Sequence, residues 1–534
     1  MNVINRMKSS KLGVAVIMAT VATMLAVPAT SAATAKSGIQ NGGALTATLV
    51  NYTWTSLDPV TYPFVGSENN LFEPIFGALF YQRPTTAGGG KGPIIVPGEA
   101  SGYKFSDHGL LVTITLRKGL KFSDGTPFNS QAVASDILRV ISPTTACTCD
   151  VEYGVIQSIT TPNSYTDVLH LSHAEPYIIE NFPATAVNYI DSPTALASEG
   201  EVKFEQYPVG AGPYEVVSDT YSSQLVLQKN PSYYVRGEPH LDKLTFLTTA
   251  ADQSAYSTLE AGESQMEVGM TTAALIKQAA ADPGQFKVWQ IGGVGSSGFY
   301  FNDDDPPFTN ILAREAVSYA TDPQQVWQIL SPNFGLVWET GSGPASAFPE
   351  RYAPGFRNYN LSKAESLVKQ VGGLSFTLLT GTSPAALQQA EVYQNEWQAA
   401  GMTVSIKQLI LPQEVVLYEN GGWQASTTTD GGFDPDINGG GLTRRFQSGG
   451  QYNGVNDPTL NGLINQSVTF VNPTTRQHVF DKINAYINAK DYGEFLYEQP
   501  LDEITASNVT GVVLSPYLNN GAQEIQWEDI GFKK

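Results

Sequence analysis

The sequence predicts an α/β protein with more than one domain, and three observations support this. Segments 110–122 and 222–230 alternate apolar and polar residues, which is typical of strands. Amphipathic helical segments are interspersed irregularly with them, which favours α/β lobes over a barrel or a bundle. The 534 residues show no internal repeat, and their number suggests roughly two to four domains.

Helices are expected where apolar residues recur every three or four positions. Asn129 or Ser130 is placed to cap the first of them, after the turn SDGTPF. Gly372 and Gly373 are placed to end the third, as glycines do at helix C-termini. The expected helices cover residues 130–141, 311–321, 361–373, 383–401 and 474–490.

Residues 1–35 have the order of a secretory signal peptide. Arg6, Lys8 and Lys11 precede an apolar run, and the small-residue stretch SAATA follows it. We expect cleavage near residues 32–35, because the run is thinned by Ala, Thr and Pro28; retention as a membrane anchor is the alternative. No cysteine lies near that point, so lipid attachment of the kind used by bacterial lipoproteins is excluded.

The composition narrows the classes of partner. The formal charge of −20 becomes −23 when the three basic residues of the signal segment are removed. Such an acidic surface argues against nucleic acid and anionic membranes. Only 15% of residues are charged, while Tyr, Phe and amide side chains are plentiful. A surface of this kind suits neutral or weakly charged ligands held by stacking and hydrogen bonds.

Metal and nucleotide sites are not expected. Cys147 and Cys149 are two residues apart, where a disulfide would be strained, so free thiols are equally compatible. His170 and His173 would face opposite sides of a strand, and no third ligand is near. Gly293, Gly295 and Gly298 match the spacing G-x-G-x-x-G, but the strand-like FYF and a double proline follow where a nucleotide-binding helix would have to begin. The intervening Asp303–Asp305 is interpreted as a solvated turn.

Catalytic patterns are equally missing from the sequence. It contains no G-x-S-x-G nucleophile elbow, and neither cysteine has a neighbouring histidine to activate it. We therefore expect neither an enzyme nor a cofactor.

Three segments resemble family 5 of the extracellular solute-binding proteins, the oligopeptide- and dipeptide-type receptors of ABC importers. LRKGLKFSDGTPFNSQAVASDI at 116–137 resembles the family's signature. PVGAGPYEVV and the NPSYY…PHLDKLTF that follows, within 208–246, resemble its GTGPY region and its continuation. FYFNDDDPPFTNILAREAVSYATDPQQV at 299–326 resembles a third family segment, and all three occur in the family's order.

The resemblance implies a two-lobed periplasmic-binding-protein type II fold with an extra third subdomain and a hinged cleft. Lobe I would comprise residues 36–79, 205–298 and 500–534. The extra subdomain would be 80–204 and lobe II 299–499. The implied function is an exported, periplasmic or extracellular monomer that captures a short peptide in the cleft and delivers it to membrane permease subunits.

The resemblance also indicates site residues. In peptide-binding members an Asp after a GWxx motif holds the peptide's α-ammonium, and Asp430 matches it, ahead of Asp434-Pro435-Asp436. Two departures stand beside this match: Thr427 replaces the family's usual Trp, and one extra residue precedes the Asp-Pro step. Asp430 as a turn cap is the structural alternative. Further candidates for ligand contact are Tyr52, Trp54, Trp423, Phe433, Arg445 with its neighbour Arg444, and Asn453.

Other cargoes and a different class of function remain open from the sequence. A receptor for an oligosaccharide or another small metabolite would also use aromatic and amide side chains. A nickel-chelate receptor would be expected to use histidine, which is scarce here, with five residues in the chain. An exported hydrolase is the remaining alternative.

Overall fold

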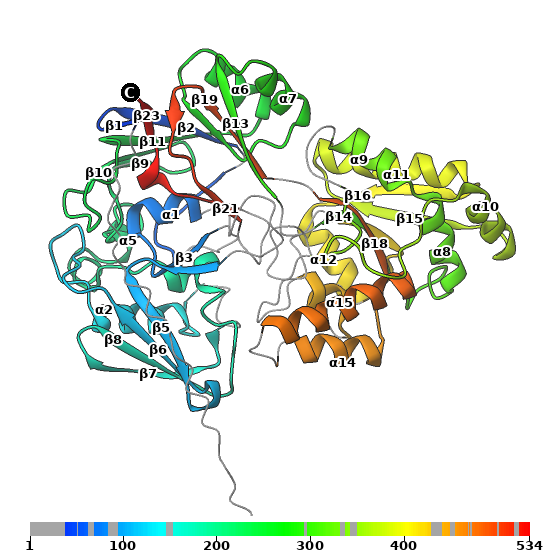
Figure 1. Cartoon of the computed structure of the whole chain (residues 1–534), viewed down its shortest axis with the longest axis horizontal. Coiled ribbons are helices and arrows are strands. Elements are labelled where there is room, and N and C mark those ends of the chain that lie inside the picture. Colours follow the sequence, from blue (N-terminus) through cyan, green and yellow to red (C-terminus); the bar gives the residue numbers. More distant parts are fainter. Residues whose placement is uncertain are drawn as a thin grey trace, which may run out of the picture. The chain divides into compact units, whose positions relative to one another are not determined.

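The structure is a computed structural model that contains several β-sheets with helices packed beside them (Figure 1). Residues 1–35, predicted to be a signal peptide, the glycine-rich segment 85–93, Cys147 and Cys149 lie outside the described residues. The described residues are 38–50, 52–61, 69–83, 94–145, 153–292, 296–331, 337–341, 350–428, 441–448, 454–467, 469, 473–498, 501–516 and 523–534.

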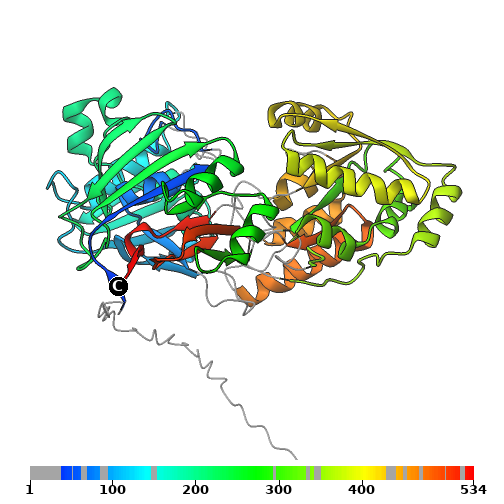
Figure 2. The ribbon, with the colours of Figure 1, turned by 90° about the horizontal axis from the view of Figure 1, so that it is seen from above.

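Seven strands form the largest sheet, in the order β13-β19-β12-β2-β11-β10-β9 (Figure 1). β2 runs parallel to β11 and β12, and the other pairings are antiparallel. In Figure 2 the blue strand β2 lies among the green strands, although a long stretch of chain separates them. The strands are β2 (Ala44–Val50), β9 (Tyr214–Thr220), β10 (Gln224–Lys229), β11 (Lys243–Thr249), β12 (Met266–Val268), β13 (Phe286–Ile291) and β19 (Leu501–Ala506).

The core of this part forms where apolar side chains of β2 and β11 meet helix α1 (Asn69–Phe76). Leu45, Leu49 and Phe246 share one buried cluster with Phe72 and Phe76. Helices α6 (Asp252–Glu260) and α7 (Ala273–Ala281) pack with a second cluster that includes strand residues Val50 and Ile504. Short strands complete the region: β1 (Ile39–Gln40), β20 (Val509–Thr510), β21 (Leu514–Pro516), β22 (Gln523–Ile525) and β23 (Gly531–Lys533).

A four-stranded antiparallel sheet, β5-β6-β8-β7, forms a separate layer with helix α2. Helix α2 begins as predicted, because the Asn129 side chain accepts bonds from the backbone N–H groups of Gln131 and Ala132. Its elements, with those that join it to the large sheet, are β3 (Phe80–Arg83), β4 (Ile94–Pro97), β5 (Ala100–Ser106), β6 (Leu111–Leu116), α2 (Ser130–Val140), β7 (Ile156–Asn163), β8 (Thr166–Leu171), α4 (Pro193–Glu199) and α5 (Glu201–Phe204).

A five-stranded sheet, β16-β15-β17-β14-β18, forms the core of the remaining region. β15 runs parallel to β16 and β17, whereas β14 pairs antiparallel with β17 and β18. Its strands are β14 (Ser296–Phe301), β15 (Ser375–Thr380), β16 (Thr403–Gln408), β17 (Ala425–Thr428) and β18 (Gly493–Glu498). Its helices are α8 (Ile311–Ala320), α9 (Pro323–Leu330), α10 (Leu361–Gln370), α11 (Pro384–Ala399), α12 (Leu411–Asn420), α13 (Gly441–Phe446), α14 (Pro458–Ser467) and α15 (Pro473–Lys490).

The elements on both sides of the glycine-rich segment are those expected from the sequence, whereas Gly293 and Gly295 lie outside the described residues. β13 ends at Ile291 and β14 begins at Ser296 in a different sheet, so a strand rather than a helix follows the glycines. Gly298 is required by packing: a Cβ there would lie 1.9 Å from the carbonyl oxygen of Glu494 in β18. A dinucleotide-binding turn is therefore excluded at this position.

The turn at Asp303–Asp305 is less solvated than expected. Asp304 is exposed, but Asp305 is half-buried, and its Oδ2 accepts bonds of 3.1 Å from Asn302 Nδ2 and from the backbone N–H of Gly422. The acidic run thus fixes the loop before β17 against the end of β14.

Candidate functional site

The parallel strands of both large sheets define edges at which ligands bind in open α/β folds. In the seven-stranded sheet, Val50 at the end of β2 is level with Thr249 at the end of β11. In the five-stranded sheet, Thr380 at the end of β15 is level with Gln408 at the end of β16. Residues 52–61 follow the first edge, and residue 430 comes two positions after the end of β17.

Tyr52 lies in the first of these loops and is only 8% exposed. Its hydroxyl accepts a 3.1 Å bond from Asn70 Nδ2, and Asn70 Oδ1 accepts a 3.1 Å bond from the backbone N–H of Ile525. Asn70 thereby ties this loop and the C-terminal segment to helix α1. No sequence pattern indicated Asn70, because its partners Tyr52 and Ile525 are not its neighbours along the chain.

Trp54 is completely buried. Its indole Nε1 donates to Asp219 Oδ1 at 2.9 Å, and its backbone N–H and C=O both bond to the Ser222 hydroxyl, at 2.8 and 2.9 Å. Burial raises the pKa of Asp219, and the bond from Trp54 opposes that shift. In this arrangement Trp54 anchors the loop to the β9–β10 hairpin, so contact with a ligand would require the loop to rearrange.

Trp423 and Arg445 belong to one buried cluster around Tyr300 of β14. Trp423 is 2% exposed and packs edge-on against Tyr300 and Tyr418 at centroid distances of 5.3 and 5.2 Å. The Arg445 guanidinium lies 5.2 Å from the centroid of the Tyr300 ring, and its side chain is buried. These two candidates therefore meet through Tyr300, a residue that was not identified from the sequence.

Hydroxyl groups gather beside this cluster at the end of β15 and β17. Thr427 Oγ1 donates to Thr380 Oγ1 at 3.1 Å, and the hydroxyls of Tyr418 and Ser426 are 2.9 Å apart. Uncharged donors and acceptors of this kind can bond to a peptide main chain or to sugar hydroxyls. They were missed because isolated Ser and Thr residues carry no recognisable pattern.

Asp430, Phe433, Arg444 and Asn453 are not placed by the structure. Asp430, Phe433 and Asn453 lie outside the described residues, as does the side chain of Arg444. The assignment of these residues, and of Tyr52, Trp54, Trp423 and Arg445, to a ligand site stays a prediction.

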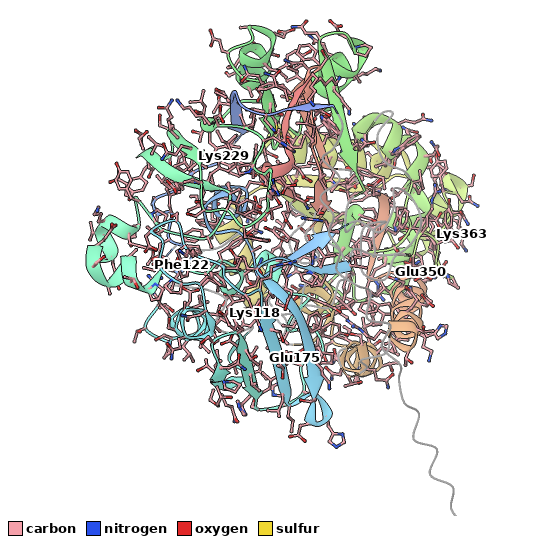
Figure 3. The ribbon with its side chains drawn as sticks, turned by 60° about the vertical axis from the view of Figure 1, so that its left-hand side comes forward. Lys118, Phe122, Glu175, Lys229, Glu350 and Lys363 are labelled. Atoms are coloured by element: carbon pink, nitrogen blue, oxygen red, sulfur yellow. The ribbon has the colours of Figure 1, made fainter. Side chains whose placement is uncertain are left out.

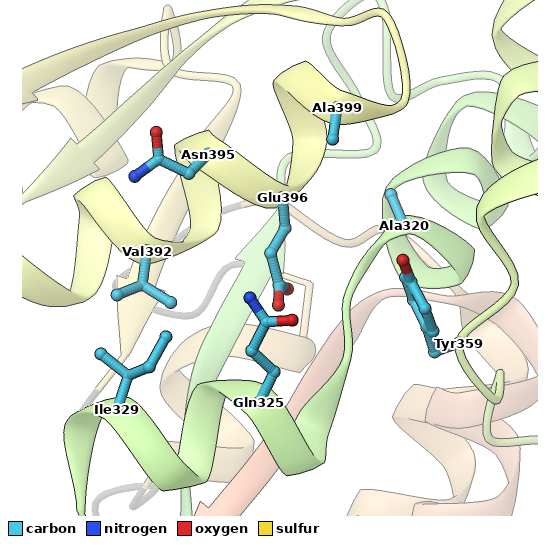
Figure 4. Close-up of a pocket in the computed structure, with 8 residues that line it drawn as sticks. All are labelled: Ala320, Gln325, Ile329, Tyr359, Val392, Asn395, Glu396 and Ala399. Atoms are coloured by element: carbon cyan, nitrogen blue, oxygen red, sulfur yellow. The ribbon is translucent and has the colours of Figure 1, made fainter.

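One cavity of about 240 Å³ opens between α8, α9 and α11 (Figure 4). Glu396 points into it beside Gln325, but its Oε2 already accepts a 3.0 Å bond from the backbone N–H of Asp322. Burial raises the pKa of Glu396 to about 7. The group stabilises the start of α9, where Asp322 is the N-cap, and gives the cavity no clear ligand chemistry. The cavity is lined by Ala320, Gln325, Ile329, Tyr359, Val392, Asn395, Glu396 and Ala399.

The described residues contain neither a metal-binding cluster nor a membrane-spanning helix. No group of three or more His, Cys, Asp or Glu side chains among them is arranged to hold a metal ion. His170 bonds instead to Thr160 Oγ1 at 3.1 Å, and His173 to Ser172 Oγ at 3.1 Å. Within the same part of the chain, no helix has the length and apolar character needed to cross a bilayer.

Comparison with solved structures shows the fold. CtaP of Listeria monocytogenes, an ABC transporter substrate-binding protein, superposes with a TM-score of 0.78 at 17% identity, over 93% of this chain and 100% of that one. The periplasmic binding protein DppA of Helicobacter pylori, solved with the peptide STSA, gives 0.70 at 20% identity, over 93% and 99%. The two-lobed type II binding-protein fold expected from the sequence is confirmed.

Comparison with sequences shows the family. The glutathione-binding protein GsiB of Salmonella typhimurium is 27% identical over 343 residues, which span 61% of this chain and 64% of the relative. The model of the bacterial extracellular solute-binding proteins, family 5, matches residues 95–451, most of the chain. The chain therefore belongs to the bacterial extracellular solute-binding proteins of family 5.

Proposed function

We propose that this protein is the substrate-binding component of an ABC importer and captures a short peptide for delivery to membrane permease subunits. Membership of family 5 over residues 95–451 is the observation that carries the proposal. Its relatives include a glutathione-binding protein and binding proteins solved with the peptide STSA and with Met-Leu. Glutathione and short peptides are thus the ligands named for all three of these relatives.

Asp430 is proposed to hold the ammonium group of the peptide. In the sequence it comes two positions after β17, a strand that runs parallel to β15. A carboxylate enclosed away from water forms a charge-assisted bond with an ammonium group, and losing it leaves a buried charge unpaired. The hydroxyls of Thr380 and Thr427, at the ends of β15 and β17, are proposed as neutral partners for a peptide main chain.

The aromatic and amide candidates complete the proposed site in two groups. Tyr52 and Trp54 come from the loop after β2, and Trp423, Phe433, Arg445 and Asn453 from the region of β17 and α13. We propose that ligand is enclosed when lobe I (36–79, 205–298 and 500–534) and the extra subdomain (80–204) close on lobe II (299–499). Sheet membership supports this division, because β19 joins the seven-stranded sheet while β14–β18 form their own.

The proposed role is that of an exported binding protein and not of an enzyme. The basic-apolar-small order of residues 1–35 supports cleavage near residues 32–35. We propose that the mature chain is a monomer, and that it has no lipid anchor because no cysteine lies near the cleavage point. N-terminal sequencing of the secreted protein should give a start at residues 33–36. An intact Met1 would contradict export by cleavage.

Calorimetric titration with a defined pool of short peptides tests the function. Asp430→Asn keeps the shape of the side chain and removes its charge, so affinity should fall about 30- to 150-fold, equivalent to roughly 2–3 kcal/mol. Asp436→Asn, in the same segment, is the matched control and should bind as the wild type does. Equal affinity of wild type and Asp430→Asn would make Asp430 a turn cap. If the wild type binds neutral oligosaccharides but no peptide, the peptide assignment fails.

A further inference from the structure

Arg476 lies in the first turn of α15, a helix that packs on α14 and β18 in lobe II. Its side chain is only 3% exposed, which is unusual for a guanidinium. Two of its partners lie outside lobe II. They belong to the turn at residues 175–181, in the region proposed as the extra subdomain.

Two contacts join Arg476 to that turn. The guanidinium carbon lies 3.5 Å from the centroid of the Tyr177 ring, which is close enough for a strong cation–π interaction. Arg476 Nη2 also lies 3.6 Å from Glu180 Oε2. The planar guanidinium can make both contacts at once, stacking through its face and pairing through its edge.

Tyr177 adds an independent third contact across the same boundary. The ring is completely buried, and its hydroxyl donates a hydrogen bond to the backbone carbonyl of Ser467, the last residue of α14. The ends of α14 and α15 thus contact one side chain from two directions. A buried phenol needs such an acceptor, because an unpaired hydroxyl in an apolar environment is costly.

The turn that carries Tyr177 is held firmly by its own subdomain. Ile178 and Ile179 are buried in the cluster that includes Val112 and Leu169 of the four-stranded sheet. The Asn181 N–H donates to the Tyr177 carbonyl at 3.1 Å, and Gln82 Nε2 donates to the Glu180 carbonyl at 3.3 Å. A displacement of lobe II must therefore break the contacts to Arg476 and Ser467, since the turn cannot follow without disrupting its own core.

Charge in the contact is complementary. Glu175, labelled in Figure 3, begins the turn, and burial raises its pKa to about 7, while the positive charge of Arg476 opposes that shift. Burial also raises the pKa of Glu180, again opposed by Arg476. The one cation of the contact thus faces two carboxyl groups that are both partly desolvated.

We propose that Arg476, Tyr177, Glu180 and the Ser467 carbonyl form a latch that stabilises the arrangement in which the extra subdomain contacts lobe II, termed here the closed form. Arg476 is then a positioning residue that sets the equilibrium between closed and open forms. A ligand that binds the closed form has an apparent affinity proportional to the closed population. The latch consequently tunes affinity without touching the ligand, and it does not depend on which ligand the protein binds.

Single-molecule energy transfer between the extra subdomain and lobe II, measured without added peptide, tests the latch. Dyes are placed at the exposed positions Lys104→Cys and Lys363→Cys, in a background carrying Cys147→Ser and Cys149→Ser. Arg476→Ala should raise the ratio of open to closed molecules about tenfold, the effect of losing one stacked, partly buried cation. Arg476→Lys retains the charge but not the planar stacking, so it should fall between wild type and Arg476→Ala.

Arg357→Ala is the matched control. Arg357 bonds to Glu315 and Asp491 at 3.0 and 3.2 Å, and all three residues lie in lobe II. Its loss should lower the melting temperature and leave the transfer distribution unchanged. Identical distributions for wild type and Arg476→Ala would overturn the proposal.

Two milder substitutions keep the test decisive if Arg476→Ala does not fold. Tyr177→Phe removes only the bond to Ser467, and Glu180→Gln removes only the ion pair. Both should shift the distribution toward the open form, and the absence of a shift in both would reject the latch. Because no peptide is present, a failure here is distinguishable from a failure of the proposed peptide binding.

Discussion

The indole of Trp54 donates a 2.9 Å hydrogen bond to the carboxylate of Asp219, 165 positions later in the chain. Trp54 is fully buried and Asp219 only 6% exposed. The bond fixes the loop after β2 to the hairpin formed by β9 and β10. The loop after β2 is thereby anchored by an acceptor that has little access to water.

Trp54→Phe should lower the free energy of unfolding by about 3 kcal/mol, because it leaves the Asp219 carboxylate without its donor and opens a small cavity. Urea denaturation followed by circular dichroism measures the change. Trp289→Phe is the matched control, since Trp289 donates at 3.0 Å to the neutral hydroxyl of Thr505 and is only partly buried. Its loss should be about 1 kcal/mol. Equal losses for the two variants would contradict the importance of the charged acceptor.

Asp167 should make stability depend on pH. It is completely buried in β8, and burial raises its pKa to about 8 from an ordinary value of 3.8. The folded state therefore holds a proton that the unfolded state has released between pH 4 and 8. Its contribution to stability is fully present below pH 4 and is lost as the pH rises through about 8.

Asp167→Asn removes the titrating group and keeps the shape of the side chain. Relative to wild type, its melting temperature should rise progressively from pH 5 to pH 9. Differential scanning fluorimetry over this range measures the difference, with Glu263→Gln, an exposed carboxylate, as control. A constant difference between Asp167→Asn and wild type would show that Asp167 does not titrate as proposed.

Gly298 and Gly462 should respond in opposite directions to alanine. A Cβ at Gly298 would meet the Glu494 carbonyl oxygen at 1.9 Å, so β14 and β18 would have to separate. Gly298→Ala should cost about 3 kcal/mol or more. Gly462 lies in α14 with open space around its Cβ position, so Gly462→Ala should stabilise by about 0.5–1 kcal/mol. Thermal unfolding of both variants checks the pair, and tolerance of alanine at Gly298 would contradict the close approach of the strands.

Local features of the fold could be predicted from the sequence because they depend on neighbouring residues. The cap at Asn129 and the glycines after α10 are decided within a few positions, and both are found as expected. The strand after the glycine-rich segment, β14, was likewise predicted from the local alternation of residues and the double proline that follows.

The site was less predictable because its residues act through distant partners. The sequence shows an aromatic residue, Trp54, close to the end of a predicted strand. Its buried orientation depends on bonds to Asp219 and Ser222, which are distant in the sequence. Likewise, Arg476 has the sequence context of an ordinary helix start, and only the fold brings Tyr177 to it. Family resemblance predicts that Asp430 is the carboxylate of the site, and it leaves the ligand unnamed.

The pairing of β19 with both β12 and β13 has a consequence for the order of folding. Within the described residues β13 bonds to no other strand of the seven-stranded sheet, so it cannot join until residues 501–506 have been made. The five-stranded sheet uses only residues 296–498, and it can finish first. Until β19 pairs with it, the seven-stranded sheet therefore has an unpaired edge at β12, which is a target for aggregation or for a chaperone.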